Sequence, residues 1–263
     1  MTVTDCEPAG RTALVTGGGT GIGRAVALAL GRAGARVGIL GRRPDPIGRV
    51  AAELASSGGE ALAVPCDVTN DAQLEKACGM VAASLGPIEI LVHCAGAAWS
   101  GPLVRLDDET MDRLLRLNLR SAFVLARLLT PAMRRQGYGR IVHLASTAAL
   151  RGYRYTAAYT ASKHALASLC RSLSAELLPH GITVNALCPG FVDTPLVDEA
   201  VNTIAEKTGG TPEEARATLA AQNPLGRLVR PEEVARAALY LVGPDSGAVS
   251  GHSLVLDGGT QPV

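Results

Sequence analysis

In LVTGGGTGIGRA, residues 14–25, a short apolar run leads into a glycine cluster and then into a helical pattern, which is typical of the first strand–turn–helix unit of a dinucleotide-binding fold. Its glycines allow a tight turn and a close approach of the backbone to a ligand. The unpaired N–H groups of the first helical turn favour a pyrophosphate. The turn is therefore predicted to bind a dinucleotide through Gly17, Thr20, Gly21, Ile22 and Gly23.

Seven short apolar runs alternate with amphipathic stretches along the chain, at 12–16, 35–40, 60–66, 88–94, 139–146, 182–188 and 253–257. Such alternation is typical of βαβ units and a parallel sheet. We therefore predict an α/β protein with a doubly wound, Rossmann-type fold: a seven-stranded parallel sheet with helices on both faces. We expect one domain over residues 11–263, preceded by a flexible tail at residues 1–10.

Residues 190–230 interrupt this alternation with a long insertion. The segment predicts two short helices separated by Gly209 and Gly210. Because it follows the sixth strand, it lies at the carboxyl edge of the sheet, where folds of this kind bind ligands. We interpret it as a helical substrate lid; a surface or interface decoration is the alternative.

The composition favours a small molecule as the partner. Of the 263 residues, 47% are hydrophobic and 19% are charged, and the net charge is +1 with scattered Lys and Arg. This pattern argues against nucleic acid and against a membrane surface as partners. The start of the chain lacks a basic segment followed by an apolar one, and no run approaches about 18 uncharged apolar residues. We expect neither a targeting signal nor a membrane span.

The cysteines are spread along the chain without paired spacing, at Cys6, Cys66, Cys78, Cys94, Cys170 and Cys188. Most have apolar neighbours, which favours buried free thiols over disulfides or a metal site. We therefore expect no metal and a reducing, cytoplasmic location.

The end of the second predicted strand selects the dinucleotide. A carboxylate there would bond to the ribose 2′-hydroxyl of NAD and repel a 2′-phosphate. The sequence ILGRRPD instead has Gly41 at this place, followed by Arg42 and Arg43. Because a guanidinium holds a phosphate through paired hydrogen bonds, NADP(H) is favoured over NAD(H). The alternative is that both arginines form a solvated corner.

Tyr159 and Lys163 in AAYTASKHAL are four residues apart, so both side chains lie on one face of a helix. Alone, such a pair is typical of an ordinary helix turn. Ser146 stands 13 positions before Tyr159, and these motifs together with the glycine turn resemble the short-chain dehydrogenase/reductase family from residue 11 to about residue 260. The resemblance implies a catalytic tetrad of Asn118, Ser146, Tyr159 and Lys163.

The same resemblance implies further cofactor contacts. The motif CDVTN would place Asp67 and Val68 beside the adenine, and PGFVDTP would anchor the carboxamide through Thr194. Lys163 would also bind the nicotinamide ribose. The remaining implied contacts are Ala95, Gly96, Tyr159, Pro189, Gly190 and Val192.

One motif departs from the family pattern. Where the family usually has Asn-Asn-Ala-Gly after the fourth strand, this chain has HCAG, with His93 and Cys94 in place of both asparagines. In the family this motif supports the sheet beneath the adenosine, so the change bears on local packing and cofactor affinity. We interpret His93 as structural and Cys94 as inert, since no base partners the thiol.

The four tetrad residues suit carbonyl reduction, in which the oxygen needs a proton donor with a pKa near the working pH. A Lys163 ammonium about 5–6 Å away is expected to lower the pKa of Tyr159 by about two units, and oxidised nicotinamide adds to this. Ser146 would donate a hydrogen bond to the same carbonyl oxygen. By resemblance, Asn118 holds a water that links Lys163 to solvent.

We therefore predict an NADP(H)-dependent oxidoreductase that reduces a ketone to an alcohol. The chain most resembles the ketoreductases of aromatic polyketide synthesis and the related 3-oxoacyl-thioester reductases. This implies a 3-oxoacyl or polyketide β-carbonyl substrate, free or on a carrier protein. The alternatives are an NAD(P)-dependent dehydrogenase that oxidises a secondary alcohol, such as a 3-hydroxyacyl or 3-hydroxybutyrate-type substrate, and a non-catalytic dinucleotide-sensing regulator.

Two further expectations concern packing and assembly. Trp99, the only tryptophan, lies in GAAWSGP after the fourth strand and either packs in the protein or lines the substrate pocket. By resemblance we expect a homotetramer, with the helices around 108–135 and 157–178 at one interface and the last strand at another.

Overall fold

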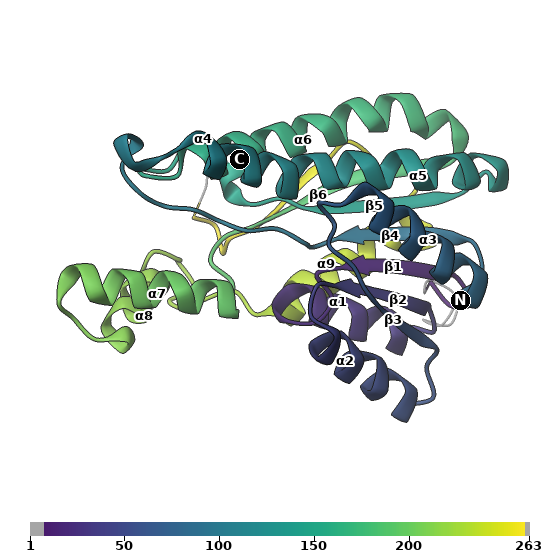
Figure 1. Cartoon of the computed structure of the whole chain (residues 1–263), viewed down its shortest axis with the longest axis horizontal. Coiled ribbons are helices and arrows are strands. Elements are labelled where there is room, and N and C mark those ends of the chain that lie inside the picture. The colour runs from purple at the N-terminus through teal and green to yellow at the C-terminus, as the bar shows by residue number, and fades with distance from the viewer. Residues whose placement is uncertain (1–7, 261–263) are drawn as a thin grey trace.

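The computed structural model describes residues 8–260 and contains a seven-stranded parallel sheet in the order β3-β2-β1-β4-β5-β6-β7 (Figure 1). The strands are β1 (Thr12–Thr16), β2 (Arg36–Gly41), β3 (Ala61–Pro65), β4 (Ile88–His93), β5 (Gly139–Leu144), β6 (Ile182–Pro189) and β7 (Ser253–Leu256). Each begins and ends within two residues of a predicted apolar run. The predicted Rossmann-type fold is confirmed, because strands are added on both sides of β1.

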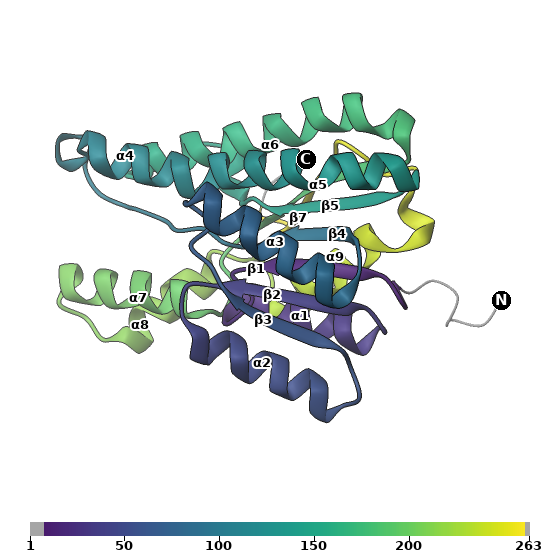
Figure 2. The same cartoon turned by 45° about the vertical axis from the view of Figure 1, so that its right-hand side comes forward.

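Helices cover both faces of the sheet (Figures 1 and 2). One layer comprises α1 (Gly21–Arg32), α2 (Pro44–Ser56) and α9 (Pro231–Val242), and the other comprises α3 (Asp71–Leu85), α5 (Ser121–Gln136) and α6 (Ala157–Leu177). α4 (Asp108–Leu115) continues into α5 through a π turn, η3 (Arg116–Arg120). Short 3₁₀ turns occur at η2 (Leu103–Arg105), η4 (Thr147–Ala149), η5 (Leu178–His180) and η6 (Pro244–Ser246).

The two layers give the protein two hydrophobic cores, and β1 shows how one strand serves both. Leu14 belongs to the core under α3, α5 and α6, whereas Ala13 and Val15 belong to the core under α1 and α9. Successive side chains of a strand point to opposite faces of its sheet. Because the sheet is buried on both sides, its strands are nearly continuous apolar runs, which is the pattern that made them recognisable in the sequence.

The predicted tail at residues 1–10 needs a correction at its inner end. Pro8 is buried, and the N–H of Gly10 donates to the carbonyl of Gly34 at 2.9 Å. The guanidinium of Arg36 also donates to the carbonyl of Gly10 at 2.9 Å. Residues 8–10 therefore belong to the folded domain, and the first seven residues lie outside the described range.

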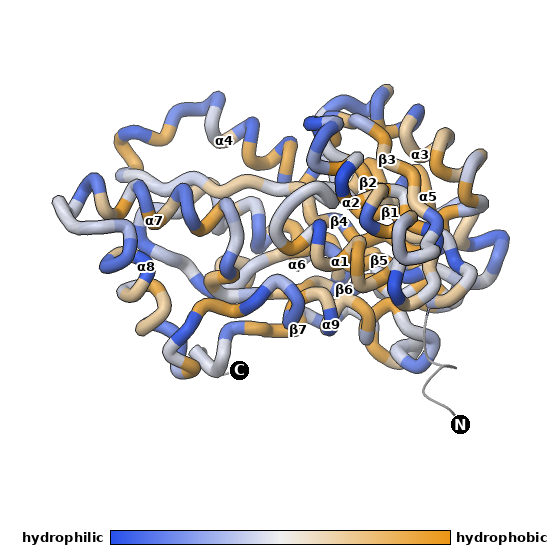
Figure 3. Tube along the Cα trace, turned by 90° about the horizontal axis from the view of Figure 1, so that it is seen from below, coloured by the Kyte–Doolittle hydropathy of each residue, from blue (hydrophilic) through white to orange (hydrophobic). Residues whose placement is uncertain are grey.

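The insertion forms two helices, α7 (Pro195–Thr208) and α8 (Pro212–Ala221), as predicted. They project from the body of the sheet (Figures 1 and 2) and alternate hydrophobic and hydrophilic residues along their length (Figure 3). Their apolar sides form a small core of their own, made of Val197, Val201, Ala205, Ala215, Leu219 and Leu228. Gly209, which has a φ of 71°, caps the end of α7, and Thr211 with Glu214 forms a capping box for α8.

None of the helices in residues 8–260 combines the length and the apolar composition that a membrane span requires.

Candidate active site

The glycine turn links the end of β1 to the start of α1 and leaves no room for larger side chains. A Cβ built on Gly23 would lie 2.2 Å from the carbonyl oxygen of Gly17, and a Cβ on Gly17 would lie 3.0 Å from the backbone of Ala95. The first turn of α1 has no acidic residue and no side-chain cap at Thr20. Its N–H groups therefore remain available to an anion, as a dinucleotide-binding turn requires.

A cleft of about 510 Å³ opens in front of this turn at the carboxyl edge of the sheet. Most of the predicted cofactor contacts line it: Gly17, Thr20, Gly21, Ile22, Gly23, Arg42, Arg43, Asp67, Val68, Ala95, Gly96 and Thr194. Sequence reasoning did not single out other lining residues, among them Gly19, Pro46, Ile47, Thr69, Arg113, Leu117 and Leu196. Pro189, Gly190, Val192, Tyr159 and Lys163 are not among the residues that line this cleft.

Arg42 and Arg43 follow β2 at one side of the cleft, and both are exposed. Neither forms an ion pair with another residue of the described range. Asp67 lies nearby, where hydrogen bonds from Thr69 lower the pKa of its carboxyl group and the charge of Arg42 lowers it further. The cleft thus presents two cations that form no ion pair with a carboxylate of residues 8–260, although Asp67 lies close enough to Arg42 for their charges to interact.

Tyr159 and Lys163 lie one turn apart near the start of α6, and Lys163 Nζ is 5.8 Å from the centre of the Tyr159 ring. Lys163 is only 4% exposed, and its Nζ donates to the carbonyl of Leu144 at 2.7 Å. Ser146 follows β5, where its Oγ accepts from the N–H of Ala148 at 3.1 Å. Ser146 also hydrogen-bonds to Tyr159. The end of β5 and the start of α6 therefore place the Ser146 hydroxyl and the Tyr159 phenol together.

The predicted lowering of the Tyr159 pKa is not what the structure shows. Burial raises the pKa of Tyr159, and the hydrogen bond from Ser146 opposes this rise. Burial also lowers the pKa of Lys163 to about 8, although the thiols of Cys188, Cys94 and Cys170 oppose the shift. In the protein without cofactor, burial is the largest cause of both pKa shifts, and it outweighs the effect of Tyr159 and Lys163 on each other.

Asn118 lies in the π turn and is fully buried. Its side chain is saturated: Oδ1 accepts from the N–H of Ala97 at 3.0 Å, and Nδ2 donates to the Ala97 carbonyl at 3.0 Å and to Ser162 Oγ at 2.9 Å. Ser162 in turn donates to the carbonyl of Tyr159 at 2.7 Å. The structure therefore connects Asn118 to the helix turn that carries Tyr159. The sequence indicated a regular helix here and missed the π turn.

The loops beside Ser146 and Tyr159 are held together by local contacts. The Tyr153 hydroxyl donates to Thr147 Oγ1 at 2.9 Å. Tyr155 has a φ of 68°, unusual for a residue other than glycine, and its carbonyl accepts from the N–H of Gly101 at 2.8 Å. A Cβ on Gly101 would lie 2.9 Å from the ring of Trp99. Trp99 is thus partly buried against Gly101.

The environment of the thiols near the cleft favours their protonated form. Burial raises the pKa of Cys94 to about 12, and the charge of Lys163 opposes this only in part. Within the described range Cys66, Cys78, Cys94, Cys170 and Cys188 are free, and Cys6 lies outside that range. The described residues contain no group of three or more His, Cys, Asp or Glu side chains placed to hold a metal ion.

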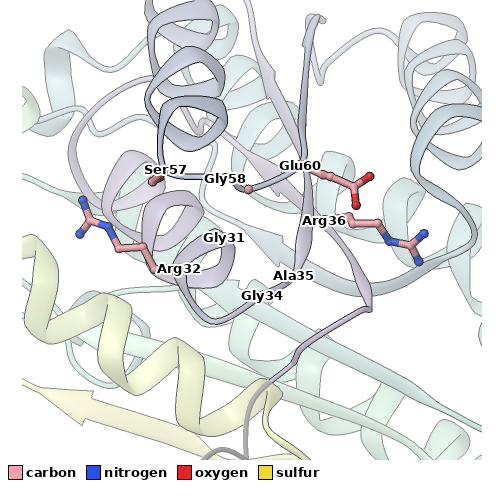
Figure 4. A pocket seen from close by; sticks show the side chains of 9 residues that line it. Gly31, Arg32, Gly34, Ala35, Arg36, Ser57, Gly58 and Glu60 are labelled. Carbon is pink, nitrogen blue, oxygen red and sulfur yellow. The ribbon is translucent and has the colours of Figure 1, made fainter.

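A second depression lies far from these residues, where α1 and α2 end and β2 and β3 begin (Figure 4). Arg32 and Arg36 flank it on opposite sides, and Glu60 lies near Arg36. It opens at the amino ends of the strands, opposite the edge where Rossmann-type folds bind their ligands. We therefore place the active site at the glycine turn.

Gly23→Ala is expected to weaken NADPH binding at least about a hundredfold, because the new methyl group would displace the carbonyl of Gly17 and open the turn. Titration of the variant with NADPH, followed by fluorescence, measures the change. Gly79→Ala is the matched control, since an added Cβ in that exposed part of α3 meets nothing within 4 Å. The control should bind NADPH normally and gain about 0.5–1 kcal/mol in stability.

Comparisons with known proteins agree with this geometry. A family model described as "Enoyl-(Acyl carrier protein) reductase" matches residues 17–261. The short-chain reductase protein NovJ of Streptomyces niveus is 38% identical over 251 residues, covering 94% of this chain and 92% of that protein. D-beta-hydroxybutyrate dehydrogenase of Rhizobium meliloti is 35% identical over 252 residues, covering 95% of this chain and 98% of that protein.

Among solved structures, the actinorhodin polyketide ketoreductase with NADPH superposes with a TM-score of 0.92. It is 35% identical in sequence, and the match covers 99% of both chains. The likeness therefore includes the sheet, both helical layers and the insertion.

Proposed function

Because this chain belongs to the short-chain dehydrogenase/reductase family, we propose that it is an NADP(H)-dependent oxidoreductase that reduces a ketone to an alcohol. The best-supported substrate is a 3-oxoacyl or polyketide β-carbonyl. The observation that carries the proposal is the convergence of Ser146 on the phenol of Tyr159, with Lys163 buried one helix turn away. Similarity to a short-chain reductase and to a polyketide ketoreductase supports the same reaction.

The residues of the cleft fit a dinucleotide. The open N–H groups at the start of α1 would hold the pyrophosphate, and the crowding around Gly17 and Gly23 keeps that turn in its tight form. We propose that Asp67 and Val68 lie against the adenine, and that Thr194 with the Pro189–Gly190 turn holds the nicotinamide. When bound, the cofactor supplies the hydride that reduces the carbonyl carbon.

The protein's own residues would handle the proton. Tyr159, whose raised pKa keeps the phenol protonated, would donate its proton to the carbonyl oxygen. Ser146 would hold the same oxygen by a hydrogen bond. The Lys163 ammonium would stabilise the phenolate that forms, and this stabilisation would strengthen where oxidised nicotinamide adds positive charge. Since the Asn118 side chain is saturated, we propose that its main chain in the π turn holds the water that links Lys163 to solvent.

NADPH is the preferred coenzyme in this proposal, because Arg42 and Arg43 are free to bind a 2′-phosphate. Replacing both by Ala is expected to raise the KM for NADPH at least about tenfold and to change the KM for NADH little. Arg49→Ala, which removes an exposed arginine of α2, is the control. A wild-type enzyme that prefers NADH would contradict this assignment.

The reductive reaction is expected to slow as the pH rises through about 8. Lys163 has a pKa lowered by burial to about 8, so its stabilising charge is present below that pH and is lost above it. A profile of kcat/KM for NADPH between pH 6 and about 10 measures the break, since this ratio reports ionisations of the free enzyme. A profile that stays flat to pH 10 would show that Lys163 does not act through its charge.

The insertion would act as the substrate lid, since Leu196 at the start of α7 lines the cleft and is 45% exposed. An exposed apolar side chain at a binding cleft favours an acyl or aromatic substrate. Oxidation of a 3-hydroxyacyl or 3-hydroxybutyrate-type alcohol is the second candidate, because a hydroxybutyrate dehydrogenase is similar over nearly the whole chain. Assays of β-keto thioesters, free or on a carrier protein, and of the corresponding alcohols in the reverse direction, decide between them.

We also propose a cytoplasmic homotetramer, with α4, α5 and α6 at one interface and β7 at the other. Phe123 on α5 is 45% exposed in the single chain, as expected of a side chain that a partner covers. Size-exclusion chromatography with light scattering should give four times the mass of the chain, and a monomer would contradict the proposal.

A further inference from the structure

His93 stands where the family usually has an asparagine, and the structure gives it a defined setting. It ends β4, is 1% exposed, and lies between β1 and the start of α5. Its Nδ1 is 2.7 Å from Thr16 Oγ1, and its Nε2 is 2.9 Å from Ser121 Oγ. Thr16 and Ser121 are equally buried, so water does not compete for these hydrogen bonds.

These hydrogen bonds form a row that runs from Ala95 through Thr16, His93 and Ser121 to Leu117. The positions of the protons in this row follow from its two ends. Ser121 Oγ is 2.5 Å from the carbonyl oxygen of Leu117, which can only accept, so Ser121 donates there. Ser121 must therefore accept from His93, and the imidazole proton is on Nε2. The bare Nδ1 then accepts from Thr16, whose oxygen accepts from the N–H of Ala95 at 3.1 Å.

The opposite tautomer, with the proton of His93 on Nδ1, leaves some of these donors and acceptors without a hydrogen-bond partner. A proton on Nδ1 would point at Thr16, and the hydroxyl hydrogen of Thr16 would lose its acceptor at Nδ1. Ser121 would then have to donate to Nε2, and its oxygen would face the Leu117 carbonyl at 2.5 Å without a hydrogen between them. Only neutral, Nε2-protonated His93 leaves every donor and acceptor in the row paired.

The two ends of this row lie at the candidate active site. Ala95 and Leu117 both line the cofactor cleft. Leu117 also precedes Asn118 in the π turn. The row thus connects the end of β1, the loop after β4 and the turn that carries Asn118. The Asn118 side chain also joins this turn to the same loop through Ala97, but it does not reach β1.

We propose that His93 is a positioning residue, which as the Nε2-protonated neutral tautomer holds Ala95 at the cofactor cleft and the π turn of Asn118 in fixed relative positions. Its catalytic consequence rests on the proposed function, whereas its tautomer and its effect on dinucleotide binding do not. The two halves of the row hold different segments, because Thr16 holds Ala95 in the loop after β4 and Ser121 holds Leu117 in the π turn.

The neighbouring His143 provides an internal comparison. It pairs with His93 across β4 and β5, and the two rings meet edge to face with centres 5.8 Å apart. His143 is fully buried, yet neither of its ring nitrogens has a hydrogen-bond partner within the described range. Burial lowers the pKa of both histidines, with Lys163 contributing to each and His143 also lowering that of His93, so both are neutral at pH 7. The two rings therefore differ in hydrogen bonding, not in burial or charge.

The first test needs no variant. Two-bond proton–nitrogen correlation spectra of the ¹⁵N-histidine-labelled protein distinguish the two neutral tautomers and the cation, and His93→Asn identifies which signal belongs to His93. We expect the Nε2–H tautomer for His93 throughout pH 6 to 8. An Nδ1–H tautomer or a charged ring in this range would overturn the proposal, whatever reaction the enzyme catalyses.

The second test compares His93→Phe with His143→Phe, which make the same change in ring size at adjacent buried positions. His93→Phe should weaken NADPH binding and lower kcat, each at least about tenfold, because it leaves Thr16 and Ser121 without a partner. His143→Phe should change neither by more than about twofold, since no hydrogen bond is lost. If the two variants change NADPH affinity and kcat equally, the hydrogen bonds of His93 have no role and the residue contributes only through packing.

Two polar variants separate the halves of the row and serve if His93→Phe fails to fold. His93→Asn places a polar atom near the position of Nδ1 and keeps the Thr16 half, so NADPH affinity should be retained while kcat falls. His93→Gln reaches the position of Nε2 and keeps the Ser121 half, so kcat should be retained while NADPH affinity falls. If both variants shift affinity and kcat in parallel, the separation of the two roles is wrong.

Discussion

Tyr159→Phe is expected to lower kcat by about a thousandfold while NADPH binds with nearly unchanged affinity. The variant keeps the ring and removes only the hydroxyl that would protonate the carbonyl oxygen, and a positioned proton donor contributes typically about 10²–10⁴ in rate. Steady-state NADPH oxidation with the best ketone substrate gives kcat, and fluorescence titration gives the cofactor Kd. Both are measured on the same preparation.

Tyr240→Phe controls for the loss of any phenol, since Tyr240 lies on α9 and is 56% exposed. It should turn over like the wild type. Unchanged turnover in Tyr159→Phe would refute the assignment of the proton donor. A loss of NADPH binding as large as the loss of turnover would instead give Tyr159 a role in the cofactor site.

Lys163→Met should nearly abolish turnover and yet stabilise the cofactor-free protein. The folded protein lowers the pKa of Lys163 from 10.5 to about 8, so folding favours the neutral amine. At pH 7 the ammonium is buried in the folded state, and the full cost of that burial opposes folding. The stability of the wild type should accordingly rise as the pH increases from about 8 to 10.5, where the unfolded chain alone remains protonated.

Removing the charge should raise the free energy of unfolding at pH 7 by about 1–3 kcal/mol, because the loss of the hydrogen bond to Leu144 offsets part of the gain. Urea unfolding at pH 7 and pH 10 measures this, and the gain should shrink at the higher pH. Lys207→Met, at an exposed position of α7, is the control and should have little effect on stability. If Lys163→Met instead destabilises the protein, the free-energy cost of burying the ammonium is smaller than the stabilisation from its contacts.

The fold was largely predictable from sequence because its determinants are local. Apolar runs mark strands that are buried on both faces. Of the predicted insertion helices, α7 ends before its cap Gly209 and α8 begins at Pro212 after its cap Thr211. The glycine turn was predictable for the same reason, since Gly23 must lack a side chain to pack against Gly17. Most of the predicted cofactor contacts consequently meet in one cleft.

The features that sequence reasoning missed depend on residues far apart in the chain. The π turn at Asn118 has helical neighbours on both sides, and no local signal distinguishes it from a regular helix. The row of hydrogen bonds through His93 joins Thr16 to Ser121, which are more than a hundred positions apart. The pKa of Tyr159 depends on burial, which spacing along a helix does not reveal. That Tyr159 and Lys163 lie one helix turn apart was predictable, but the direction in which the pKa of Tyr159 shifts was not.

We propose above that this enzyme transfers hydride from NADPH to a ketone carbon while Tyr159 protonates the oxygen. We test this by incubating the wild type and Tyr159→Phe with NADPH that carries deuterium at both positions of the nicotinamide C4, together with a panel of β-keto thioesters, quinones and simple ketones. Mass spectrometry then locates the deuterium. We predict an alcohol that carries deuterium on its carbinol carbon with the wild type, and at most traces with the variant. No deuterated alcohol from any ketone would show that the enzyme does not transfer hydride to a ketone, and equal amounts from both proteins would show that Tyr159 is not the proton donor.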